Sequence, residues 1–155
     1  MTLLLDIDGV LETSPAWKTP RLLEDGFYQF NVEAQENLKA IIAQFQPEII
    51  LTTTHRVNYT LEQWRQIFQA RGMNIAKISK INDAGNSTEL RKRNQEIEAW
   101  FYKNTGIDFL ILDDDTSLYE LPLVIKERWI RIDPLLGITR EIKQEIMKKF
   151  SPSKT

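Results

Sequence analysis

The sequence contains no cysteine and a single histidine. Without thiols the protein can form neither a disulfide nor a thiolate nucleophile, and zinc or iron–sulfur sites with cysteine ligands are excluded. An excess of one charge is also missing, since 20 basic and 22 acidic residues give a net charge of −2. Bulk charge therefore recruits neither nucleic acid nor an anionic membrane. A metal site in this chain has to be built mainly from oxygen ligands.

Long apolar runs are missing as well. No stretch approaches the roughly 18 residues that a transmembrane helix requires, and no basic leader or small-residue cleavage site precedes the first apolar run. We therefore expect a cytoplasmic protein that does not contact a membrane. Its 155 residues predict one domain over residues 1–150, followed by a frayed tail at 151–155. The sequence has no internal repeat, no linker and no pattern that specifies an oligomeric state.

Two aspartates follow the first apolar run. Residues 3–5 are three leucines, which is typical of a strand buried on both faces, and Asp6 and Asp8 come where that strand should end. Gly9 then predicts a sharp turn that brings the two carboxylates around one point. Like charges this close are unfavourable unless a cation or a shared proton lies between them. A solvated turn is the alternative interpretation.

A second apolar run also ends in acidic residues. Residues 109–112 are followed by Asp113, Asp114 and Asp115. Because open α/β sheets carry their sites at the carboxyl ends of parallel strands, we expect the two acidic segments to meet at one edge. Hard oxygen ligands favour Mg²⁺ over zinc. An acidic cap on the next helix or turn is the alternative.

The rest of the chain alternates between helix and strand patterns, which predicts a three-layer α/β domain with a mainly parallel central sheet. Apolar residues at helical spacing, with capping signals, predict helices over residues 31–45, from Thr60 to Gly72, over 88–102, and after Thr139. Short apolar or alternating runs predict strands from residue 2 or 3, over 49–51, 75–81, 107–112 and 129–132.

Four motifs follow one another in a fixed order: Asp6–Leu11, Glu48–Thr54, Arg91–Arg93 and Leu110–Asp114. They are an Asp-x-Asp strand end, a strand ending in threonine, basic residues at a helix start, and an aspartate pair after an apolar strand. This order resembles the haloacid dehalogenase (HAD) superfamily of phosphohydrolases, over residues 2 to about 116. The resemblance implies a HAD-like Rossmannoid domain with a minimal cap or no cap.

Three further features resemble the small HAD domains of bacterial RNA-repair proteins, known as Swiss Army Knife proteins. These are the threonines before His55, Trp100 at the close of a helix, and the segment 137–139. Residues 12–30 occupy the position where the superfamily has a flap over the site. Prolines and turn residues there argue against a long helix, and 27–30 predict a short hairpin strand. The aromatic residues of this segment can equally cover the sheet edge.

The resemblance implies a Mg²⁺-dependent phosphomonoester phosphatase. Asp6 would attack phosphorus to form an aspartyl-phosphate, and Asp8 would act first as general acid and then as general base. Mg²⁺ would be held by Asp6, by the backbone carbonyl of Asp8 and by Asp114, with Asp113 as supporting neighbour or replacement. The phosphorylated substrate would be a small molecule or a nucleic-acid end, such as a nucleotide or polynucleotide phosphate. A non-catalytic HAD-like module that binds Mg²⁺ and phosphate is the alternative.

Candidates for binding phosphoryl oxygens come from the second and third motifs. Thr53 best matches the second motif, although three consecutive threonines leave the register open by one residue. Arg93 best matches the third motif, with Lys92 and Lys80 as alternatives.

The residues after Thr53 are candidates for substrate binding: Thr54, His55 and Arg56. His55 can bind substrate or orient a loop. Arg56 carries a permanent charge and can hold two oxygens at once.

Overall fold

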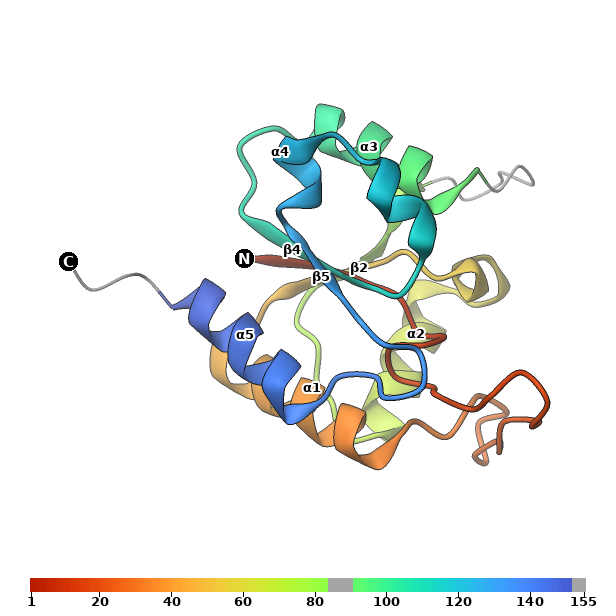
Figure 1. Ribbon diagram of the computed structural model, residues 1–155. Coiled ribbons are helices and arrows are strands. Elements are labelled where there is room, and N and C mark those ends of the chain that lie inside the picture. Colours follow the sequence, from red (N-terminus) through yellow and green to blue (C-terminus); the bar gives the residue numbers. More distant parts are fainter. Residues whose placement is uncertain (84–90, 152–155) are drawn as a thin grey trace.

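The computed structural model describes residues 1–83 and 91–151. A sheet lies at the centre of the molecule (Figure 1). It has five strands in the order β3-β2-β1-β4-β5, and neighbouring strands are parallel. The strands are β1 (Thr2–Leu5), β2 (Glu48–Leu51), β3 (Ile78–Lys80), β4 (Phe109–Asp113) and β5 (Trp129–Arg131). The α/β class and the parallel sheet predicted from the sequence are confirmed.

The register of the sheet brings the ends of three strands to one level. The last residues of β1 and β2 pair with each other, and the last residue of β1 also pairs with Leu112 of β4. The residues that come next are Asp6, Thr52 and Asp113. Side chains that approach from three separate parts of the sequence are thus adjacent at the carboxyl edge of the sheet.

Helices cover both faces of the sheet (Figure 1). One layer contains α1 (Val32–Phe45), α2 (Leu61–Ala70) and α5 (Arg140–Phe150), and the other contains α3 (Arg93–Lys103) and α4 (Leu123–Lys126). This is the predicted three-layer arrangement. No helix in the described part of the chain is long and apolar enough to cross a membrane.

The central strand β1 contributes to both hydrophobic layers. Leu3 and Leu5 pack into the cluster with α1, α2 and α5, while Leu4 packs into the cluster with α3 and α4. Successive side chains of a strand point to opposite faces, so an uninterrupted leucine run is required here. Burying each leucine contributes about 1.5–3 kcal/mol. This two-sided packing fixes the position of the next residue, Asp6.

Two helix starts follow their sequence signals. Thr60 and Gln63 form a capping box at α2, where the Thr60 hydroxyl accepts the Gln63 N–H at 3.1 Å and the Gln63 side chain accepts the Thr60 N–H at 2.8 Å. Thr139 caps α5 by accepting the N–H of Ile142 at 3.2 Å. Each such cap stabilises its helix by about 1 kcal/mol. The predicted starts of both helices are confirmed.

Two predicted elements have different bounds in the structure. The strand expected over 75–81 is only Ile78–Lys80, because it pairs with β2 alone and Asn82, at φ 57°, turns the chain. The helix expected from residue 88 begins at Arg93, where tertiary contacts hold its first turn. One of them is the N–H of Asn94, which donates to Ser117 Oγ at 3.2 Å. Residues 84–90 and the tail at 152–155 lie outside the described residues.

Residues 12–30, which we call the flap, contain a single antiparallel bridge in place of the predicted hairpin strand. The bridge joins Leu22 and Tyr28. The buried Arg71, at the end of α2, donates to the Tyr28 carbonyl at 2.6 Å and to the Asp25 carboxylate at 2.6 Å. The bridge is framed by its own backbone hydrogen bonds, from the Leu23 N–H to the Phe27 carbonyl at 2.8 Å and from the Gln29 N–H to the Arg21 carbonyl at 2.7 Å. These bonds leave the Tyr28 carbonyl available to Arg71. Arg71 therefore holds the flap against α2.

Candidate active site

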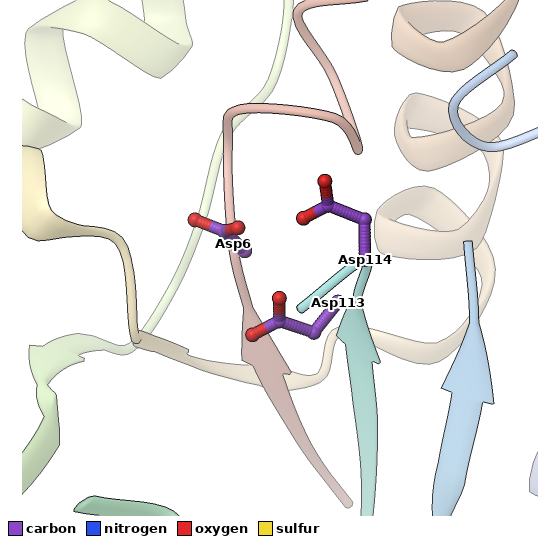
Figure 2. Close-up of side chains that lie close together, drawn as sticks. All are labelled: Asp6, Asp113 and Asp114. Atoms are coloured by element: carbon purple, nitrogen blue, oxygen red, sulfur yellow. The ribbon is translucent and has the colours of Figure 1, made fainter. Parts of the chain in front are cut away.

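Three carboxyl groups meet where β1 and β4 end. Asp6 follows β1, Asp113 is the last residue of β4, and Asp114 follows it. One ligand oxygen from each side chain lies within 4.8 Å of the others, and Figure 2 shows the three side chains gathered at these strand ends. Asp6 and Asp113 are buried, being 5% and 0% exposed. The two acidic segments of the sequence thus meet as predicted.

The turn after β1 places Asp8 apart from this cluster. The Ile7 carbonyl accepts the N–H groups of both Val10 and Leu11, at 3.1 and 2.9 Å, which closes a tight turn. The Asp8 side chain is 53% exposed. No described residue donates a hydrogen bond to its backbone carbonyl. Asp8 therefore lies outside the cluster with its side chain about half exposed, and the structure does not group its carboxylate with that of Asp6 as expected.

Gly9 allows the same turn to lie against Asp114. Its φ is +77°, in the left-handed region that glycine favours. A Cβ built on Gly9 would lie within 2.5 Å of Asp114 Cγ, closer than any real contact. The glycine is therefore required both by the backbone conformation and by the space that the Asp114 carboxylate occupies.

Arg93, the first residue of α3, joins the cluster. Its Nη1 lies 2.5 Å from Asp113 Oδ2 and 3.3 Å from Asp6 Oδ2, and it is 3.4 Å from the Thr52 hydroxyl. The sequence alternatives Lys92 and Lys80 form no ion pair with a described carboxylate. Of the three candidates for the third motif, the structure brings Arg93 to the aspartates.

The charges in this cluster do not balance. Three carboxylates and one guanidinium leave two negative charges uncompensated when every group is ionised. Asp113 uses both oxygens within the protein, because Oδ1 accepts the Asp115 N–H at 3.0 Å and Oδ2 accepts from Arg93. Asp6 is engaged as well, since its Oδ1 accepts the Ile7 N–H at 2.8 Å, but its Oδ2 lies farther from Arg93 Nη1, at 3.3 Å. The arrangement is suited to a divalent cation held by oxygen ligands.

Burial is the main cause of the perturbed acidities here. It raises the pKa of Asp6 to about 6, of Asp113 to about 7 and of Asp114 to about 6. The Arg93 charge acts in the opposite direction on all three pKa values, but does not cancel the effect of removal from water. Nearby carboxylates raise each pKa further. A cation in the cluster would favour the ionised forms.

The three threonines after β2 have different surroundings. Thr52 is buried and its hydroxyl faces Arg93 at 3.4 Å. Thr53 is also buried, and its hydroxyl accepts the N–H of His55 at 3.2 Å, which caps the short 3₁₀ helix η1 (Thr54–Asn58). Thr54 is exposed. Sequence reasoning selected Thr53, and the structure shows Thr52 as the threonine that contacts the Arg93–aspartate cluster.

Arg56 is engaged inside the protein. Its guanidinium pairs with Glu96 of α3, and its Nη1 donates to the carbonyls of Thr52 and Thr53 at 3.1 and 3.0 Å. The residue is 6% exposed. These contacts leave Arg56 buried rather than facing a phosphoryl group, in contrast to the expected anion-binding position. The pair ties η1, which follows β2, to the helix that carries Arg93.

His55 contacts the second aspartate of the first motif. Its Nε2 lies 2.9 Å from Asp8 Oδ2. The hydrogen bond to Asp8 raises the pKa of His55, and partial burial acts against this rise. The rings of Phe27 and Tyr28, from the flap, pack edge-to-face with the imidazole at centroid distances of 5.6 and 5.2 Å. The sequence placed the flap that carries both rings beside the site, but it gave no sign that they would contact His55.

A parallel α/β sheet whose two adjacent central strands end in clustered aspartates, with a cation from a later helix against them, defines a domain of the HAD type. A family model described as "HAD domain in Swiss Army Knife RNA repair proteins" matches residues 2–142, and the chain belongs to this family. Membership places it with the HAD-type phosphohydrolases at the superfamily level. Neither the curated proteins nor the solved structures include a significant match to the chain.

Proposed function

We propose that this protein is a Mg²⁺-dependent phosphomonoester phosphatase that works through an aspartyl-phosphate intermediate. The observation that carries the proposal is the buried Asp6 carboxylate, which lies beside Arg93 and has an oxygen within 4.8 Å of oxygens of Asp113 and Asp114. A nucleophile, a permanent cation and a cluster of hard oxygen ligands are the groups that phosphoryl transfer to an aspartate requires.

The first step transfers the phosphoryl group to Asp6. A carboxylate oxygen of Asp6 attacks phosphorus, the bond from phosphorus to the ester oxygen breaks, and Asp8 gives its proton to the departing oxygen. Arg93 holds phosphoryl oxygens and offsets their negative charge. A threonine hydroxyl at the end of β2 donates a further hydrogen bond, from Thr53 or from its neighbour Thr52. The products of this step are an alcohol and the aspartyl-phosphate.

The second step releases phosphate. Asp8, now ionised, takes a proton from a water molecule as the water oxygen attacks phosphorus, and the bond to the Asp6 oxygen breaks. Inorganic phosphate leaves, and Asp6 is again a carboxylate while Asp8 is again protonated. One aspartate therefore serves as acid and then as base, so both steps need its carboxyl group at the same place.

The residues present fit Mg²⁺. Asp6 and Asp114 would hold the ion together with the backbone carbonyl of Asp8, with Asp113 fixing Arg93 and the Asp115 backbone beside them. Bound there, Mg²⁺ would offset the charge of the phosphoryl group and of the clustered carboxylates. The two negative charges left by three aspartates and one arginine match one divalent cation.

We infer that the substrate is a nucleotide or polynucleotide phosphate. The family description refers to RNA repair proteins. In the described chain, the flap is the segment that lies beside the site. Its residues 12–30 contain no helix or strand and form no separate cap domain. A site without a large cap admits a phosphate at the end of a long chain.

Mg²⁺ binding is expected to stabilise the protein more at pH 8 than at pH 5. The three clustered carboxyls have pKa values of about 6 to 7 when folded, above the ~4 of an unfolded chain. Their contribution to stability is therefore full below about pH 4 and is lost as pH rises through 6 to 7. Mg²⁺ needs the ionised forms. Saturating ion should raise the melting temperature by roughly 5–10 °C at pH 8 and by much less at pH 5.

Thermal melts at both pH values, with and without Mg²⁺, measure this difference. Asp114→Asn is the matched variant and should lose most of the increment at pH 8. Equal increments at the two pH values, or a wild-type increment in Asp114→Asn, would count against the metal site.

Hydrolysis assays test the activity itself. Wild-type protein should hydrolyse 4-nitrophenyl phosphate with Mg²⁺ and lose this turnover when the ion is chelated. Oligonucleotides carrying a 3′- or a 5′-phosphate then test the substrate class, with release of inorganic phosphate as the measurement. Folded protein that binds Mg²⁺ but hydrolyses none of these compounds would favour the alternative, a non-catalytic module that holds Mg²⁺ and phosphate.

A further inference from the structure

Asp8 has little to hold its carboxylate in place. Its side chain is 53% exposed, and among the described residues the only hydrogen-bond partner of that carboxylate is His55, whose Nε2 lies 2.9 Å from Oδ2. An exposed side chain samples several rotamers, and each lost rotamer has an entropic cost. A hydrogen bond to an ionised group contributes about 1.5–3 kcal/mol, enough to select one of them.

His55 itself is held from three sides. Its backbone N–H donates to the Thr53 hydroxyl at 3.2 Å, and the next residue is anchored by the buried Arg56–Glu96 ion pair. The flap rings Phe27 and Tyr28 meet its imidazole nearly at right angles, with interplanar angles of 89° and 85°. These contacts fix the imidazole, whose side chain is 21% exposed.

The two flap rings are in turn fixed by Arg71. This guanidinium binds the Asp25 carboxylate and the Tyr28 carbonyl, and lies 5.6 Å from the centre of the Phe27 ring. The contacts therefore run from Arg71 through the flap rings to His55 and from His55 to Asp8. None of these groups belongs to the cluster of Asp6, Asp113 and Asp114, so the side chains in this series of contacts are not among the proposed ligands of the cation.

We propose that His55 is a positioning residue that holds the Asp8 carboxyl group for proton transfer to the leaving oxygen, and that the flap acts on catalysis by fixing His55. The proposal rests on the phosphatase function argued above. With Oδ2 held by the imidazole, Oδ1 is the oxygen left to carry the proton toward the leaving group. Because the same carboxyl must later accept a proton from water, one contact serves both steps.

The effect of His55 should depend on the leaving group. Phenyl phosphate and 4-nitrophenyl phosphate have nearly the same size, but phenoxide is the more basic leaving group and needs protonation more. The constant kcat/KM reports the step in which the leaving group departs. For His55→Ala we expect a loss in kcat/KM that is roughly tenfold greater, or more, with phenyl phosphate than with 4-nitrophenyl phosphate, since general acid catalysis contributes about 10²–10⁴-fold.

His55→Gln is the conservative variant. Its amide N–H can take the place of the imidazole Nε2–H, so it should restore most of the kcat/KM lost with phenyl phosphate. Melting temperature and the Mg²⁺-dependent increment of each variant show whether the fold and the cluster are intact. A variant with a lower melting temperature or a smaller Mg²⁺-dependent increment has lost activity through damage to the fold or to the metal site, and not through Asp8 alone.

The outcomes separate the two proposals. Equal losses for both substrates in His55→Ala, or no recovery in His55→Gln, would overturn the positioning role while the phosphatase function stands. Absence of Mg²⁺-dependent turnover in the wild type with either ester and with the phosphorylated oligonucleotides would overturn the phosphatase function, and the positioning role with it. A leaving-group-dependent loss that His55→Gln repairs supports both.

Discussion

The Asp6→Asn variant is expected to lose all phosphatase turnover and to keep its fold. An asparagine has the same shape, but its amide oxygen is too weak a nucleophile to displace an alkoxide or aryloxide from phosphorus. Removing a nucleophile of this kind lowers kcat by at least ~10³-fold. The carboxyl it replaces has a pKa raised to about 6 by burial, so a neutral amide there also removes a desolvation cost. Stability in the absence of Mg²⁺ should be unchanged or higher.

Hydrolysis of 4-nitrophenyl phosphate with saturating Mg²⁺ measures the loss, and a thermal melt reports the fold. Asp108→Asn is the matched control. Asp108 precedes β4, at the opposite end of the strand from the site, where its exposed side chain pairs with Arg128 at 3.0 Å. Exposed pairs of this kind contribute at most about 1 kcal/mol. Wild-type turnover in Asp6→Asn would rule out the aspartyl-phosphate route.

The parts of the fold and site that could be predicted from the sequence are those determined by short-range pattern. Three leucines followed by Asp6, and four apolar residues followed by Asp113 and Asp114, indicate buried strands with acids at their ends. The handedness and parallel pairing of α/β units then bring those ends together. The cluster of three aspartates followed from these two rules.

The parts that could not be predicted depend on contacts between distant segments. Arg56 has the charge for anion binding, but its partner Glu96 lies 40 residues away, and no local pattern indicates that the two are buried together. In the flap, the predicted hairpin is present only as the bridge between Leu22 and Tyr28, and Arg71, 43 residues further along the chain, holds Tyr28 against α2. In both cases a guanidinium, with several donors, joins segments that no local pattern relates.

The choice between Thr52 and Thr53 depends on the register, which the sequence left open by one residue. The residue beside Asp6 at the sheet edge follows from the pairing of Leu5 with Leu51. A one-residue shift in a strand reverses the direction of every side chain. Because residues 52–54 are all threonine, the sequence looks the same after a shift of one residue. Knowledge of the pairing register, which the sequence alone does not provide, would have selected Thr52.

Replacing Gly9 by alanine is expected to abolish Mg²⁺ binding and turnover while most of the fold remains. The new methyl group would overlap the Asp114 carboxylate, and the residue would have to keep a φ of +77°. The backbone strain alone costs about 1–2 kcal/mol. The overlap has to be relieved by moving either the turn that carries Asp8 or the Asp114 side chain. Either movement separates groups that the cluster and the proton transfer need together.

Gly106→Ala is the matched control, because it has the backbone strain of a left-handed alanine without an overlap of the new methyl group. Gly106 also has a left-handed conformation, at φ +85°, but nothing lies within 4 Å of the position of its added Cβ. It lies between α3 and β4, at the edge of the sheet opposite the aspartates. Both variants should therefore lose a similar 1–2 kcal/mol of stability, but only Gly9→Ala should lose the Mg²⁺-dependent rise in melting temperature and the hydrolysis of 4-nitrophenyl phosphate. If Gly9→Ala behaves like Gly106→Ala in both measurements, the contact between the Asp8 turn and Asp114 has no part in the site.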